Sequence, residues 1–199
     1  IYSATRLRAA LPRLEALRSA PEEVRHVAPL LADCGVRFAI VEPIPGTKID
    51  GACFWIHDDQ PVVALSLRLD RIDNFWFVLR HELEHVLRED GKDTGFVLDQ
   101  DLEGAASVDP AEIAANQAGA EFCVPQAEMS GFIARVSPFY SEERVVLFAK
   151  RLQLHPGLVV GQLHRRLNRF DFLRRHQVKV RSFVTASART DGYGLVTTG

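Results

Sequence analysis

A chain of 199 residues with 47% hydrophobic content is long enough for one globular domain with a small appendage. Its net charge of −2 does not indicate a nucleic-acid or membrane partner, and no apolar run reaches the roughly 18 residues of a membrane span. The cysteines are odd in number, widely spaced and without a CxxC pair: Cys34, Cys53 and Cys123. They predict free thiols in the cytoplasm and argue against a disulfide framework or a cysteine-based zinc site.

Residues 1–33 predict an N-terminal helical arm. Four leucines recur at helical spacing: Leu7, Leu11, Leu14 and Leu17. Pro21 interrupts this pattern and begins a second helical segment that ends near Ala32. We expect the arm to pack on the domain that follows or to join it to an upstream segment.

Three extended segments rich in Val, Ile, Phe and Trp come next, at residues 36–41, 52–56 and 62–67. Residues 57–61 have the composition of a hairpin turn, in which His57 is a turn residue and not a ligand. The pattern predicts an α+β domain over residues 34–181, with a small, mostly antiparallel three-stranded sheet followed by helices. Residues 182–199 predict a flexible C-terminal tail, since their last part is rich in Gly, Ser and Thr.

The strongest functional signal is an HExxH pattern at residues 81–85, inside a stretch whose apolar residues recur at helical spacing. Two histidines four apart on a helix project from one face, so His81 and His85 can reach one metal ion, with Glu82 beside them. The alternative is a solvated polar face. Phe77 and Val78 flank the histidines one turn earlier and indicate that this face is covered, where polar groups need partners. We therefore favour a metal site.

A second helix is predicted between Asp109, which can cap it, and Pro125, which ends it. Its middle is nearly all Ala and Gly, which allows a close approach, and we place it against the metal helix. Catalytic zinc sites use three protein ligands. Glu112 is the candidate third ligand, and Asn116, one turn further on, would orient a neighbouring group.

Other interpretations of the third ligand stay open on spacing alone. Asp109 and Glu112 also fit a capping box, in which the glutamate only bonds the start of its own helix. The alternative ligands are the other acidic residues nearby: Glu121, Glu103, Asp101 and Asp99.

The run from Asp70 to Leu87, followed by Glu112-x-x-Ala115-Asn116 and Pro125, resembles the ImmA/IrrE metallo-endopeptidase domain. It resembles in particular the version attached to HigA-like antitoxins and Xre-type regulators, over about residues 34–165. The resemblance implies a zincin-like helical bundle in which Zn²⁺ is held by three residues: His81, His85 and Glu112. It makes Glu82 the catalytic base. Glu84 and Ala118 depart from the family pattern, and Glu84 is expected to point away from the histidines.

The resemblance implies a zinc endopeptidase that cleaves a regulatory protein, a repressor or a toxin–antitoxin partner. Glu82 would take the proton of a metal-activated water, and an extended substrate would add to a sheet edge or to residues 96–98. The donor for the oxyanion stays open among three residues: Tyr140, His155 and His164. The alternative is a non-proteolytic antitoxin or transcription-regulator module that keeps the fold.

DNA binding by these residues is not expected, because the helix-turn-helix domain of the HigA-like versions would lie upstream of this chain. Two predicted helices, at residues 141–152 and 157–168, are separated by a short turn, and the second ends in basic residues. A helix-turn-helix is one interpretation of this pattern. We favour the other, in which their apolar residues complete the core.

Overall fold

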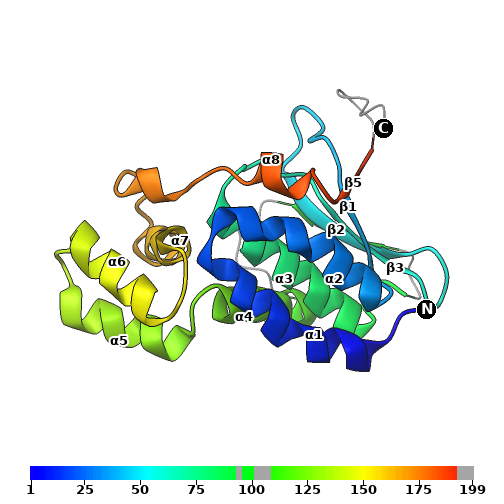
Figure 1. The fold of residues 1–199 in the computed structure, drawn as a ribbon, viewed down its shortest axis with the longest axis horizontal. Helices are drawn as coiled ribbons and strands as arrows, with labels where there is room; N and C mark the ends of the chain where they lie inside the picture. The colour runs from blue at the N-terminus through cyan, green and yellow to red at the C-terminus, as the bar shows by residue number, and fades with distance from the viewer. Residues whose placement is uncertain (93–95, 101–108, 192–199) are drawn as a thin grey trace.

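The computed structural model of the chain describes residues 1–92, 96–100 and 109–191 (Figure 1). Its α-helices are α1 (Ala4–Ala16), α2 (Val27–Asp33), α3 (Ile72–Arg88), α4 (Pro110–Cys123), α5 (Gln126–Val136), α6 (Glu142–Arg151), α7 (Pro156–Leu167) and α8 (Arg181–Val184). Short 3-10 helices span Leu17–Ser19, Pro21–His26 and Arg174–His176. The strands are β1 (Arg37–Ile40), β2 (Ile49–Trp55), β3 (Pro61–Leu65), β4 (Phe96–Gln100) and β5 (Arg189–Thr190). The fold class is α+β, as predicted.

The described strands form one mixed sheet in the order β4-β2-β3-β1-β5. The predicted hairpin is present, because β2 and β3 pair antiparallel and Ile56 N donates to Gln60 O at 3.1 Å. The prediction of three mostly antiparallel strands was wrong, since β1 runs parallel to both β3 and β5. The outer strands β4 and β5 come from distant parts of the chain, and no local sequence pattern predicts which strands they pair with.

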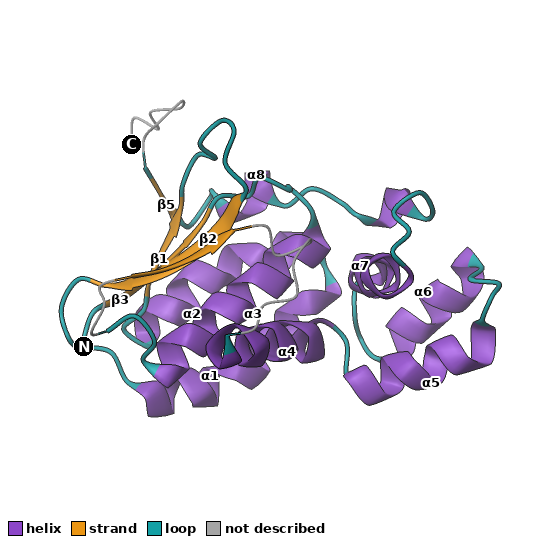
Figure 2. Cartoon of the chain, turned by 180° about the vertical axis from the view of Figure 1, so that it is seen from behind, coloured by secondary structure: helices purple, strands orange, loops and turns teal. Residues whose placement is uncertain are grey.

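Helix α3 lies at the centre of the molecule and contacts α1, α4, α7 and strands β2 and β3. Figure 2 shows α1 to α4 gathered on one side of the sheet, with α5 to α7 forming a second helical group away from it. The predicted arm is helical and contributes to the same core, because Leu7 and Leu14 are fully buried. Tyr2 Oη also donates to Val86 O of α3 at 3.2 Å.

The C-terminal segment is tied to the start of α3. Asp70 Oδ1 accepts hydrogen bonds from the backbone of Val180 and Arg181 at 2.8 and 2.9 Å, and Ile72 N donates to Val178 O. Within residues 182–191 the chain completes α8, and β5 pairs with β1. Residues 192–199 lie outside the described residues, and the division into arm, domain and tail stays a prediction.

Helix α7 is buried along most of its length, including Leu158, Val159, Val160 and Leu163. A recognition helix must present its side chains to the major groove, so this burial favours the core interpretation of the C-terminal helices. Cys34, Cys53 and Cys123 are all buried, and burial raises the pKa of the Cys123 thiol to about 12. None of the helices in the described ranges is long and apolar enough to cross a membrane.

Helices α3 and α4 approach closely at Gly119. A Cβ placed there would lie 2.9 Å from the backbone oxygen of Phe77 and 3.1 Å from its ring. The predicted close approach of an Ala/Gly-rich helix is therefore confirmed, and it allows α4 to lie directly along α3.

We expect Gly119→Ala to destabilise the protein. Overpacking a fitted contact costs about 1–3 kcal/mol, which outweighs the helix propensity of about 1 kcal/mol that alanine gains over glycine. Urea unfolding measures the difference. The control is Gly131→Ala in α5, where an added Cβ would meet only the flexible end of Arg135 at 3.2 Å. Equal or higher stability of Gly119→Ala would contradict the close contact.

Candidate metal centre

The HExxH residues lie on the inner part of α3. His81, Glu82 and His85 are each 0% exposed, and Phe77 and Val78 are also buried. The face that carries the histidines is therefore covered, as their apolar neighbours predicted. Buried imidazoles and carboxylates need partners, so the groups facing them decide what this site can do.

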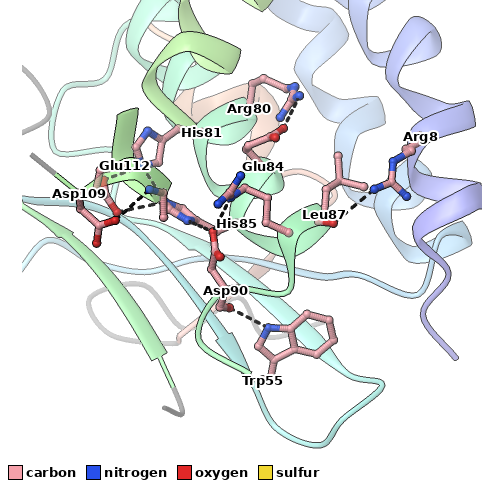
Figure 3. A network of polar contacts seen from close by, with 12 residues as sticks. Arg8, Trp55, Arg80, His81, Glu84, His85, Leu87, Asp90, Asp109 and Glu112 are labelled. Atoms are coloured by element: carbon pink, nitrogen blue, oxygen red, sulfur yellow. Dashed lines mark hydrogen bonds and ion pairs between the residues drawn. The ribbon is translucent and has the colours of Figure 1, made fainter. Parts of the chain in front are cut away.

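Glu112 supplies the facing group from the first turn of α4. Its Oε2 lies 3.4 Å from His81 Nε2 and its Oε1 lies 3.3 Å from His85 Nε2, while the two Nε2 atoms are 3.1 Å apart (Figure 3). Asp109 caps α4 by accepting from Ala111 N at 2.8 Å. The Glu112 carboxylate therefore faces both histidines.

These distances fit a metal ion. Four ligands at 2.0–2.1 Å in a tetrahedron around zinc lie about 3.3 Å from one another, close to the separations seen here. Ligand atoms of His81, His85 and Glu112 all lie within 4.8 Å of one another. Two imidazoles and a carboxylate are also donors that suit zinc. The group can therefore hold a metal ion.

Asp90 fixes the orientation of His85. Its Oδ2 lies 3.0 Å from His85 Nδ1, and Arg88 Nε donates to the same oxygen at 3.1 Å. The Asp90 backbone is held as well, because its N–H donates to His85 O and its carbonyl accepts from Trp55 Nε1. Since a carboxylate only accepts, Nδ1 would donate its proton to Asp90 whenever the Nε2 lone pair of His85 binds a metal ion.

Sequence reasoning missed Asp90. The chain turns back at Glu89, which has a left-handed φ of 61°, and this turn places Asp90 beside the last turn of α3. An acidic residue just beyond a metal-binding helix was the available signal. The turn that brings Asp90 next to His85 is visible only in the structure.

Other predicted residues lie elsewhere or outside the description. Glu121 accepts from Gln126 N at 2.9 Å, next to the start of α5, so it serves a helix end and not the metal group. Asp101 and Glu103 fall outside the described residues, as does the side chain of Asp99. Asn116 is half-buried, and its orienting role stays a prediction.

The candidate oxyanion donors have structural contacts of their own. His155 Nδ1 accepts from Gly157 N and caps α7, and burial lowers the pKa of its imidazole. His164 Nε2 lies 2.7 Å from Phe172 O, and the Tyr140 ring packs near the same phenylalanine. Their catalytic role stays a prediction.

Glu84 pairs with Arg80 at 2.7 Å, and Figure 3 shows this pair pointing away from Glu112. This matches the expected orientation of Glu84. Glu84 is therefore accommodated by an ion pair along α3, away from the face that carries the histidines.

A family model described as the IrrE N-terminal-like domain, peptidase family M78, matches residues 36–168. The chain belongs to this peptidase family. The match begins just before β1 and ends at residue 168, directly after α7, so it includes both helices of the metal group. The chain therefore contains a metallopeptidase-type domain. A search of curated proteins finds no match.

We expect Asp90→Ala to weaken zinc binding by about 10–100-fold, because outer carboxylates that orient a metal-binding histidine contribute on that scale. Competition with a chromophoric chelator measures the affinity. The control is Asp58→Ala in the exposed β2–β3 turn, which removes the same charge away from the site. If both variants bind zinc as the wild type does, Asp90 does not orient His85.

Proposed function

We propose that this chain is a zinc-dependent endopeptidase that cleaves a regulatory protein of the repressor or antitoxin type. The observation that carries the proposal is the convergence of two imidazoles from α3 and one carboxylate from α4 next to a buried glutamate. Membership of a peptidase family supports the same reaction class.

His81, His85 and Glu112 would hold the zinc, and three protein ligands leave one position for chemistry. When bound, zinc supplies Lewis acidity toward a peptide carbonyl and makes its water more acidic. Glu82, the neighbour of His81 in α3, would accept the proton and deliver it to the leaving amine. A module that only binds a partner has no use for such a base.

The sheet offers a way to bind an extended substrate. Strand β4 lies at one edge of the described sheet and pairs antiparallel with β2, which packs against α3. A peptide added beside β4 would bond through its backbone, as extended peptides commonly do. The choice of a repressor or antitoxin as substrate is supported by the likeness to the versions linked to HigA-like and Xre-type regulators.

The first test compares the wild type with Glu82→Gln during co-expression with a repressor or antitoxin partner. Loss of the base should slow cleavage by about 10²–10⁴-fold while zinc stays bound, because the amide keeps the shape but cannot accept the proton. Intact-mass analysis detects the processed partner. Processing by neither protein would favour the non-proteolytic module, and equal processing by both would remove Glu82 from the mechanism.

The second test concerns the third ligand. Glu112→Ala should reduce the zinc content from about one ion per chain to a small fraction of that, since two histidines alone make a weak site. Elemental analysis after dialysis measures it. Glu121→Ala is the matched control, because it removes the same charge from the other end of α4. Full zinc content in Glu112→Ala would show that another residue completes the site.

A further inference from the structure

Gly51 of β2 lies directly against the Glu82 side chain. A Cβ placed on Gly51 would lie 2.1 Å from Glu82 Oε1 and 2.9 Å from Glu82 Cδ, so the carboxylate occupies the space that any other residue would need. Both residues are buried. The φ angle of Gly51 is not among the positive ones, so its backbone conformation is open to alanine. A Cβ at this position would therefore displace the Glu82 carboxylate.

The strand is irregular at this point. The pairing of β2 with β4 shifts between Ile49 and Gly51, so Asp50 is the extra residue of a β-bulge. Bulges re-aim the backbone next to active sites. Here the bulge turns the bare Cα of Gly51 toward α3.

The bulge is anchored by the segment that directly follows β3. Arg68 donates to both oxygens of the buried Asp50 carboxylate, at 3.2 and 2.9 Å, and Ser66 N donates to Asp50 O at 3.0 Å. A bidentate pair of this kind fixes both distance and orientation. The backbone at Gly51 is therefore held in place relative to β3.

We propose that Gly51 is a positioning residue. Because it has no side chain, the Glu82 carboxylate can pack against its backbone, and this contact keeps the carboxylate beside the metal ligands. The proposal rests on the proposed function, in which Glu82 is the base. Gly51→Ala then displaces this carboxylate while leaving His81, His85 and Glu112 in place. Zinc binding is kept, and kcat falls by about 100-fold, the effect of a misplacement near 1 Å.

A double-mutant cycle tests the contact without any need for activity. Urea unfolding of the full chain is followed with a chelator present, for Gly51→Ala in three backgrounds: wild type, Glu82→Gln and Glu82→Ala. If residue 51 packs against the side chain of residue 82, Gly51→Ala should lower the unfolding midpoint by a similar amount in the wild-type and Glu82→Gln backgrounds, because glutamine fills the same space as glutamate. The lowering should be smaller in the Glu82→Ala background, where that space is empty. The other close neighbour, Val78 Cγ1 at 2.8 Å, is common to all three and cancels. Equal lowering in all three backgrounds overturns the proposal.

Kinetics separate positioning from general damage. With the co-expressed partner purified as substrate, Gly51→Ala should lower kcat with KM changed less than about two-fold and with zinc retained. Gly131→Ala in α5 is the control and should leave both constants unchanged. A wild-type kcat in Gly51→Ala, or a loss explained by lost zinc, overturns the positioning role. If the wild type cleaves nothing, the proposed function fails. The double-mutant cycle measured by urea unfolding still decides whether the Glu82 carboxylate packs against Gly51.

Discussion

The close packing of α3 and α4 is the constraint on which the candidate site depends. Gly119 lets α4 approach the backbone of Phe77, and this approach places the first turn of α4 opposite the His81–His85 face. A metal site needs its ligand atoms within a few tenths of an ångström of ideal positions. A small residue at this crossing therefore contributes to metal geometry although it touches no ligand.

The surroundings of α3 hold each functional side chain from a different direction. Asp90 orients His85 from beyond the end of the helix, and the bulge of β2 limits where the Glu82 carboxylate can lie. Asp70 connects the start of α3 to the C-terminal segment through two backbone hydrogen bonds. One buried helix thus carries the two histidines of the candidate metal group and the proposed base, while the sheet, the terminal segment and α4 fix its position. This arrangement puts the site on rigid elements, where its geometry is well determined.

The charged residues around the site are arranged so that they can balance the charge of a divalent ion. With two neutral imidazoles and the Glu112 carboxylate as ligands, a divalent ion would keep one unbalanced positive charge, which groups one layer out would offset. Asp90 is such a group, and it also pairs with Arg88. Arg80 pairs with Glu84 on another side of α3, so the additional acidic residue of this HExxH pattern would not compete for the ion.

The sequence by itself determined the elements and the chemistry that local spacing encodes. The 3.6-residue period of α3, the four-residue separation of its histidines and the Ala/Gly composition of α4 are local properties, so the metal helix, its partner helix and the α+β class could be predicted. Only the tertiary structure places the Glu112 carboxylate opposite the histidines, because that placement depends on how two helices cross. The parallel pairing of β1, the positions of Asp90 beside His85 and of Gly51 beside Glu82, and the packing of residues 182–191 are likewise visible only in the structure. Each of these features depends on contacts between segments that are far apart in the chain, or on the geometry of a turn. A local sequence pattern predicts neither.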